Sequence, residues 1–158
     1  MARFEIATLI HAPIERCFDL ARSVELHVRS AGETREQVVG GRTSGLLDRG
    51  EQVTWRARHL GAWRSLTSQI TRFDRPRSFR DSQVRGPFAR FDHDHVFEGV
   101  AGATRMTDVL DYAAPLGWLG RLAEVAILNA HLQAFLTERA AVIKRVAESD
   151  EWRRYTAA

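Results

Sequence analysis

The chain carries a long helical pattern near its C-terminus, directly after a series of strand-like segments. Between residues 118 and 148, apolar residues recur along one stripe, and neither proline nor glycine follows Gly120. Such a helix would be about 40 Å long and must bury its stripe against the preceding strands. The stripe is expected to hold Leu122, Ala126, Leu132, Leu136, Ile143 and Val146, with charged residues such as Glu138 and Arg139 off it.

Seven segments before this helix have the alternating or β-branched pattern of strands. They are residues 3–10, 33–39, 51–59, 63–73, 78–85, 90–98 and 104–113, of which 33–39 has the weakest pattern. Short turns and a glycine-bearing loop over 99–103 separate the later segments, which predicts antiparallel pairing. Two short helices, over 13–22 and 24–30, are predicted after the first strand.

Together these elements predict an α+β architecture. A curved antiparallel sheet of six or seven strands would wrap around the long C-terminal helix, with two short helices near the N-terminus. The sequence contains no repeat or linker, so residues 1–158 are expected to form a single domain. A gap between a bent sheet and one helix destabilises the fold unless something fills it, which favours a bound ligand.

Composition restricts the possible partners and location of the protein. The net charge is +3, but the arginines are scattered among acidic residues, so we expect no nucleic-acid binding. No apolar run approaches the roughly 20 residues that span a bilayer, and the first residues lack a signal-peptide core. The single Cys17 excludes an internal disulfide. We therefore expect a cytoplasmic protein whose Cys17 is a buried and inert thiol, and its oligomeric state, monomer or dimer, stays open.

Several motifs resemble one known superfamily over nearly the whole chain. They are WRARH (55–59), LTSQI (66–70), GPFARFDHDH (86–95), TRMTD (104–108) and PLGWLGRL (115–122). In these segments the sequence resembles the START-like helix-grip superfamily (SRPBCC), in particular a bacterial polyketide cyclase/dehydrase-like or ligand-binding subgroup of unknown function. The resemblance implies a small, largely apolar ligand such as a polyketide, isoprenoid, lipid or aromatic molecule. It implies no catalytic residue, because members differ in their pocket linings.

One strand combines aromatic and titratable residues on the same face. Alternation places one set of side chains together on the face expected to be concave. This set is Phe91, His93, His95 and Phe97, whereas Asp92, Asp94 and Val96 point to the other face.

Charge pairing then predicts the register of the neighbouring strands. If Glu98 lies opposite Arg105, the apolar residues of the two strands also match. The predicted pairs are Phe97 with Met106, His95 with Asp108, His93 with Leu110 and Phe91 with Tyr112. In the preceding strand, Phe79 is expected near Phe97, Asp81 near His95 and Gln83 near His93. The predicted ligand-binding wall is Phe79, Asp81, Gln83, Phe91, His93, His95, Phe97, Met106, Asp108, Leu110 and Tyr112.

Four interpretations of this polar band remain open. The carboxylates can simply hydrogen-bond the buried histidines, or the band can orient a ligand in an apolar cavity. His93 or His95, oriented by Asp108, can also act as a general acid or base in cyclisation or dehydration. Finally, the two histidines can bind a metal with Asp81 or Asp108 as third ligand. Because the sequence shows no clear third ligand, we expect neither metal nor cofactor.

The function predicted first is therefore the binding of a small apolar molecule. A cyclase or dehydratase that uses His93, His95 and Asp108 is the first alternative. A protein-interaction module with a closed core, docking a partner near residues 118–122, is the second. Tyr112 is predicted to offer a hydroxyl to a ligand, and His59 and His131 are expected on solvated or mixed faces.

Overall fold

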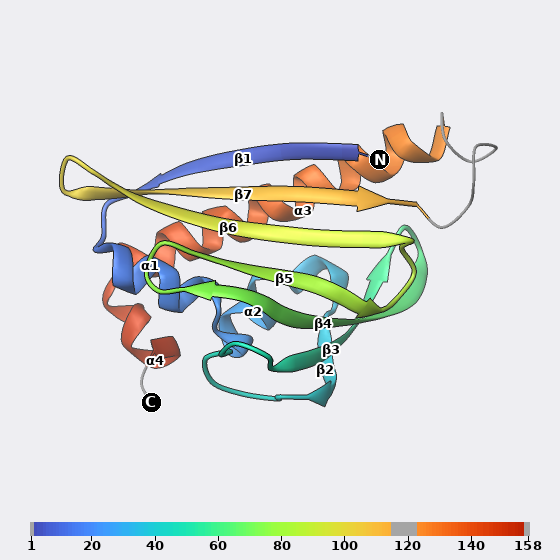
Figure 1. Cartoon of the computed structure of the whole chain (residues 1–158), viewed down its shortest axis with the longest axis horizontal. Coiled ribbons are helices and arrows are strands. Elements are labelled where there is room, and N and C mark those ends of the chain that lie inside the picture. Colours follow the sequence, from blue (N-terminus) through green and yellow to red (C-terminus); the bar gives the residue numbers. More distant parts are fainter. Residues whose placement is uncertain (1, 115–122, 157–158) are drawn as a thin grey trace.

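The computed structural model describes residues 2–114 and 123–156. Figure 1 shows one curved sheet with the long helix α3 crossing behind it. The strands are β1 (Ala2–Ile10), β2 (Gln37–Gly41), β3 (Gln52–His59), β4 (Ala62–Asp74), β5 (Ser78–Arg85), β6 (Arg90–Val100) and β7 (Ala103–Ala113). The helices are α1 (Ile14–Ala21), α2 (Val24–Ser30), α3 (Ala123–Ala147) and α4 (Arg153–Thr156), with 3₁₀ turns at Gly32–Thr34 and Asp150–Trp152. The predicted α+β helix-grip architecture is confirmed.

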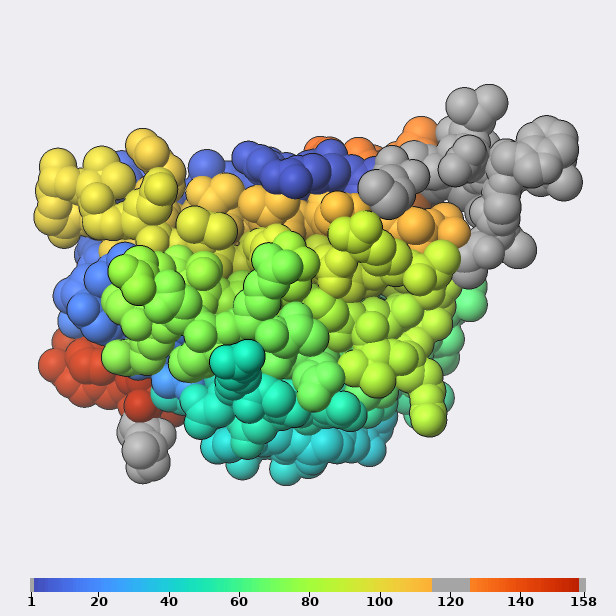
Figure 2. All heavy atoms as spheres, in the orientation of Figure 1, coloured from blue at the N-terminus to red at the C-terminus, as the bar shows by residue number. Residues whose placement is uncertain are grey.

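The sheet is antiparallel throughout, with strand order β1-β7-β6-β5-β4-β3-β2. Strands β2 to β7 follow one another as in a meander, whereas β1 pairs with β7 from the far end of the sequence. In the space-filling view, side chains of the sheet cover most of α3 on this side of the molecule (Figure 2). The other side of the sheet, toward α3, is therefore the concave face that holds the core.

Helix α3 packs on that concave face through most of the predicted stripe. Leu132, Leu136, Ile143 and Val146 are buried, as their helical spacing predicts. Residues 118–122 of the predicted helix, including Leu122, lie outside the described residues. Ala126 is exposed, so its predicted place in the stripe is wrong.

Arg139 is the main correction on α3. It was expected on the polar side, but it is only 5% exposed and donates from Nη2 to the carbonyl oxygen of Ala21 at 2.8 Å. Position 139 falls between Leu136 and Ile143 on the buried side of the helix. Its long side chain reaches past the apolar contacts to a backbone acceptor at the end of α1.

The two short helices close one end of the sheet. Phe18 of α1 is fully buried and meets the rings of Phe73, Phe79 and Phe97 edge-on, at centroid distances of 5.3, 5.3 and 5.4 Å. Cys17 is buried as well, and burial raises its pKa, consistent with an unreactive thiol. Helix α2 begins after Ser23, whose hydroxyl accepts a hydrogen bond from the Leu26 amide at 3.3 Å.

Three local features differ from the sequence predictions. Strand β2 begins at Gln37 because a 3₁₀ turn occupies Gly32–Thr34. The predicted five-residue loop over 99–103 is a two-residue turn, since β6 and β7 pair as far as Val100 and Ala103. Ala101 and Gly102 both have positive φ, at 49° and 83°, as a tight hairpin turn requires. The short helix α4 was not predicted.

Within residues 2–114 and 123–156, no helix has the length and hydropathy needed to cross a membrane.

Candidate functional site

A cavity of about 550 Å³ lies between the concave face of the sheet and helix α3. This volume falls within the range of small-molecule sites. The cavity is bordered by β3, β4, β5, β6 and β7 on one side and by α3 on the other. It reaches the surface between the β3–β4 hairpin and α3, where Leu60 and Ile127 are 58% and 60% exposed.

Most of the cavity wall is apolar. Its apolar side chains come from the sheet, the loop between β5 and β6, and α3. They include Trp55, Leu66, Phe88, Phe91, Leu110, Leu128, Leu132, Phe135 and Leu136. A wall of this kind takes up an apolar molecule because the molecule loses its contact with water there.

Three of the charged or titratable side chains of the wall belong to its buried or half-buried part. Asp81 and His93 project from the sheet, and Arg139 from α3. Arg139 Nε is buried without a hydrogen-bond partner. Such a donor requires an acceptor to offset its lost hydration, and a ligand in the cavity can provide one.

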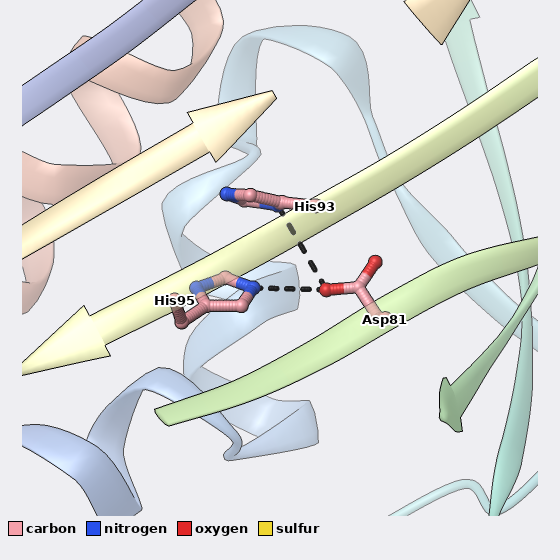
Figure 3. A group of neighbouring side chains, drawn as sticks. All are labelled: Asp81, His93 and His95. Atoms are coloured by element: carbon pink, nitrogen blue, oxygen red, sulfur yellow. Dashed lines mark hydrogen bonds and ion pairs between the residues drawn. The ribbon is translucent and has the colours of Figure 1, made fainter. Parts of the chain in front are cut away.

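His93 belongs to a compact cluster of four side chains that we call the His–Asp cluster: Asp81, His93, His95 and Asp108. His95 Nε2 lies 2.8 Å from Asp81 Oδ2, and His93 Nε2 lies 2.8 Å from Asp108 Oδ1. The two imidazoles lie against each other at a centroid distance of 3.8 Å. Figure 3 shows that both rings face the same carboxylate oxygen of Asp81. Each carboxylate therefore lies at the edge of both rings.

The pKa values of both carboxyl groups in the cluster are lowered, whereas those of the two imidazoles are shifted in opposite directions. Burial opposes ionisation of Asp81, but the hydrogen bond to His95 and the nearby imidazoles outweigh it and lower its pKa to about 2. The pKa of Asp108 is lowered for the same reasons. Burial and the neighbouring His95 lower the pKa of His93. Burial also disfavours charge on His95, but the two carboxylates outweigh it and raise its pKa. Proton uptake is thus easier at His95 than at His93.

The predicted pairing of β6 with β7 is confirmed over its whole length. Phe91 lies opposite Tyr112, His93 opposite Leu110, and His95 opposite Asp108. The match works because both the charged ends and the apolar residues of these strands favour one register.

The predicted register of β5 with β6 is wrong by two residues, because Phe79 lies opposite His95 and Asp81 opposite His93. The predicted proximities of Asp81 to His95 and of Phe79 to Phe97 are nevertheless confirmed, at 2.8 Å between atoms and 6.2 Å between ring centroids. A shift of two keeps every side chain on its face, so the apolar pattern cannot detect it. The outer face contains the missing signal, because only the observed register pairs Arg80 with Asp94, whose atoms approach to 2.6 Å.

Gln83 is also displaced from its predicted place beside His93. Its side chain folds back on the loop between β5 and β6, where Nε2 donates to the Phe88 carbonyl at 2.8 Å. The Phe88 amide donates to Oε1 of the same side chain at 3.2 Å. Gln83 thus closes the loop that carries Phe88 into the cavity wall.

The remaining predicted residues divide between the cavity wall and the core. Asp81, Phe91, His93 and Leu110 border the cavity. The others are buried in the sheet beside or beneath it: Phe79, His95, Phe97, Met106, Asp108 and Tyr112. Tyr112 donates its hydroxyl to Asn129 Oδ1 of α3 at 3.3 Å, and burial raises its pKa. Whether these residues bind a ligand stays a prediction.

Sequence reasoning missed a second pair of histidines in the cavity wall. His59 Nδ1 of β3 lies 2.9 Å from His131 Nε2 of α3, and both residues border the cavity. Such a bond needs one neutral ring as acceptor. The residues are 72 positions apart, so neither spacing nor alternation reveals the contact.

His59 is expected to titrate below an ordinary histidine. Burial lowers its pKa, and the neighbouring His131 lowers it further, against an opposing effect of Glu36. The stability that a neutral His59 contributes is present above its unfolded pKa of about 6.5 and is lost as pH falls through the folded value. In His131→Gln, NMR should record a higher His59 pKa. An unchanged titration would contradict the contact between these rings.

His27 and Glu36 form a further polar group beside Trp55. The His27 ring stacks on Trp55 at a centroid distance of 4.0 Å, and its Nε2 lies 3.2 Å from Glu36 Oε2. All three residues border the cavity. The contact between His27 and Glu36 and the stacking of His27 on Trp55 were not predicted. Residue 36 falls in the segment with the weakest strand pattern.

Three residues of the His–Asp cluster are also arranged as metal ligands. One donor atom each from Asp81, His93 and His95 lies within 4.8 Å of the others. Carboxylate and imidazole donors in this number suit a divalent transition metal.

No family model matches the sequence, and no curated protein shows significant similarity to it. Solved structures do resemble the chain. The Zhui aromatase/cyclase from a Streptomyces species is 15% identical with a TM-score of 0.74, covering 99% of this chain and 96% of its own. A protein from Thermus thermophilus is 18% identical with a TM-score of 0.72, covering 92% of this chain and 99% of its own.

A START superfamily protein from Mycobacterium smegmatis is 12% identical with a TM-score of 0.70, covering 92% of this chain and 97% of its own. At these identities the likeness concerns the fold. It confirms the START-like helix-grip fold that the motifs predict.

Proposed function

We propose that the protein binds one small molecule with a largely apolar body in the cavity between the sheet and α3. The observation that carries this proposal is the composition of the cavity: about 550 Å³ of space with a mostly apolar wall and a limited set of polar side chains. A core filled by side chains would leave no such cavity, and an empty cavity of this size would destabilise the fold.

The polar groups restrict the chemistry of the ligand. Asp81 and His93 offer acceptors and donors on one wall, and Arg139 Nε offers a donor without a partner. A polyketide, isoprenoid, lipid or aromatic compound with an oxygen-bearing end would satisfy these groups while its body lies against the apolar residues. The likeness to START and aromatase/cyclase structures supports this class of ligand.

Mass spectrometry of the protein purified under native conditions tests the proposal. Small molecules released on denaturation should include one apolar compound in stoichiometric amount. The same compound should bind again to the emptied protein. If no compound is released, and a set of polyketide, isoprenoid, acyl and aromatic compounds fails to bind, the proposal is wrong.

Ala57→Phe should reduce the affinity for that compound at least about tenfold, or about 1.4 kcal/mol. Ala57 is buried on β3 and borders the cavity, so the larger ring takes up space that the ligand needs. Titration calorimetry measures the change. Arg58→Phe, which adds the same ring to the exposed face of this strand, is the matched control and should bind normally. Equal affinities of the two variants would place the ligand elsewhere.

A specific observation favours a second candidate, an enzyme of the cyclase or dehydratase type. His93 borders the cavity, while its Nε2 is held by Asp108 at 2.8 Å. A carboxylate in this position fixes the tautomer and leaves Nδ1 as a proton acceptor. For an enzyme, His93→Gln should abolish turnover of the bound compound while binding persists. For a binding protein, the same variant changes only the affinity.

A further inference from the structure

The His–Asp cluster contains ring nitrogens that converge on one point. His95 Nε2 lies 2.8 Å and His93 Nδ1 3.8 Å from the same oxygen, Asp81 Oδ2. The three side chains come from neighbouring positions of β5 and β6, and Figure 3 shows both rings turned toward Asp81. Two imidazoles and one carboxylate that meet in this way form the donor set of many transition-metal sites.

Asp108 occupies the opposite side of both rings. Its Oδ1 lies 2.8 Å from His93 Nε2 and 3.1 Å from His95 Nδ1. Histidines that bind a metal donate their other ring N–H to an acceptor, which fixes the tautomer and aims the ligating nitrogen. A single carboxylate here supplies that acceptor to two histidines.

His95 Nδ1 provides an independent observation. His95 is 1% exposed, and this nitrogen has no hydrogen-bond partner although an Asp108 oxygen lies 3.1 Å away. When a neutral His95 carries its proton on Nε2, toward Asp81, the lone pair of Nδ1 faces a carboxylate oxygen, and either a second proton or a cation at Nε2 relieves that contact. A cation at Nε2 moves the proton to Nδ1, which then donates to Asp108.

The charge of the cluster is compatible with the same occupant. Asp81 and Asp108 bring two carboxyl groups to the cluster, which a proton on an imidazole or a cation can offset. Buried charges require a counter-charge or a proton. Arg139 approaches Asp81 and offsets part of this charge. A divalent cation between Asp81 and the two histidines offsets both carboxylates and leaves Arg139 available to a ligand.

We infer that Asp81, His93 and His95 bind a divalent transition-metal ion of the Zn²⁺ type, through Asp81 Oδ2, His93 Nδ1 and His95 Nε2, with Asp108 as the positioning residue behind both histidines. Asp81 and His93 border the cavity, so the remaining coordination position faces the space proposed for the ligand. The inference is separate from the proposed function, because an apolar ligand can bind whether or not a metal is present.

The test uses the full chain without an affinity tag, dialysed against a chelator and then against metal-free buffer. Titration calorimetry with Zn²⁺ should give one site per chain, and Co²⁺ should produce the visible absorption of a low-symmetry site. Asp108→Asn should weaken Zn²⁺ binding about 10–100-fold, as expected of a residue behind the ligands. His95→Gln should weaken it further. Circular dichroism establishes that each variant is folded.

His59→Gln is the matched control, because the His59–His131 pair is the other place where two imidazoles meet among the described residues. It should leave Zn²⁺ binding unchanged. X-ray absorption spectroscopy of the Zn²⁺-loaded wild-type chain, which needs no variant, should detect two imidazole ligands. The inference is overturned if the chain binds no Zn²⁺, if His59→Gln abolishes the binding, or if the absorption spectrum lacks imidazole.

Discussion

Asp108→Ala is expected to lower the free energy of unfolding by about 3–5 kcal/mol, as for other buried ion pairs that lose one partner. Asp108 is 3% exposed and is the acceptor for His93 Nε2 at 2.8 Å. Alanine leaves that N–H buried without a partner and removes one of the two carboxylates that raise the pKa of His95. Urea unfolding of the chelator-treated protein at pH 7 measures the loss.

Asp94→Ala is the control for this prediction. Asp94 lies on the outer face of β6, where it pairs with Arg80 at 2.6 Å and its side chain is 31% exposed. Water screens this pair, so its removal should cost no more than about 1 kcal/mol. Similar losses in the two variants would mean that Asp108 contributes no more than an ordinary surface carboxylate.

Asp108→Ala should also change how the free energy of unfolding depends on pH in the acidic range. The folded pKa of Asp81 is about 2, below its ordinary 3.8, so its contribution is present above the unfolded pKa and is lost as pH falls through the folded value. For Asp81 this amounts to about 2 kcal/mol. Asp108, with its lowered pKa, loses its contribution in the same direction. Asp108→Ala should therefore lose less stability than the wild type between pH 5 and pH 2.

Phe18→Ala should lower the free energy of unfolding by about 3–5 kcal/mol. The ring is fully buried and touches three other phenylalanines edge-on, at 5.3 to 5.4 Å between centroids. Its removal leaves a space that the surrounding α1 and β4 to β6 cannot close. Thermal and urea unfolding measure the effect.

Val39→Ala is the matched control for Phe18, because Val39 lies on edge strand β2 and is 53% exposed. Its change should stay within about 0.5 kcal/mol. A comparable effect at both positions would contradict the assignment of Phe18 to the centre of the core. Phe18 does not border the cavity, so ligand binding by folded Phe18→Ala should persist.

The fold was predictable because local pattern and tertiary packing agree. The helix over 24–30 and the strand over 78–85 appear with the predicted bounds. Pairing of β6 with β7 was predictable for a related reason: Glu98 with Arg105 and Phe97 with Met106 favour the same register.

The cavity was predictable only in part. Alternation identifies the face on which His93 and His95 lie. It cannot detect the two-residue shift in the register of β5 on β6 that brings Asp81 opposite His93. Likewise, a buried arginine such as Arg139 has no signature along a helix, because its burial depends on a backbone carbonyl that α1 presents. The meeting of His59 with His131 depends on how α3 crosses the sheet.

The pairing of β1 with β7 has a consequence for synthesis of the protein on the ribosome. Every other ladder of the sheet joins strands that are neighbours in sequence, and these hairpins can form as soon as they emerge. Strand β1 emerges first, yet its partner residues, Thr104 to Tyr112, are among the last of the sheet to be made. Throughout that interval the nascent chain presents an unpaired strand, so its early segments need protection from association with other chains.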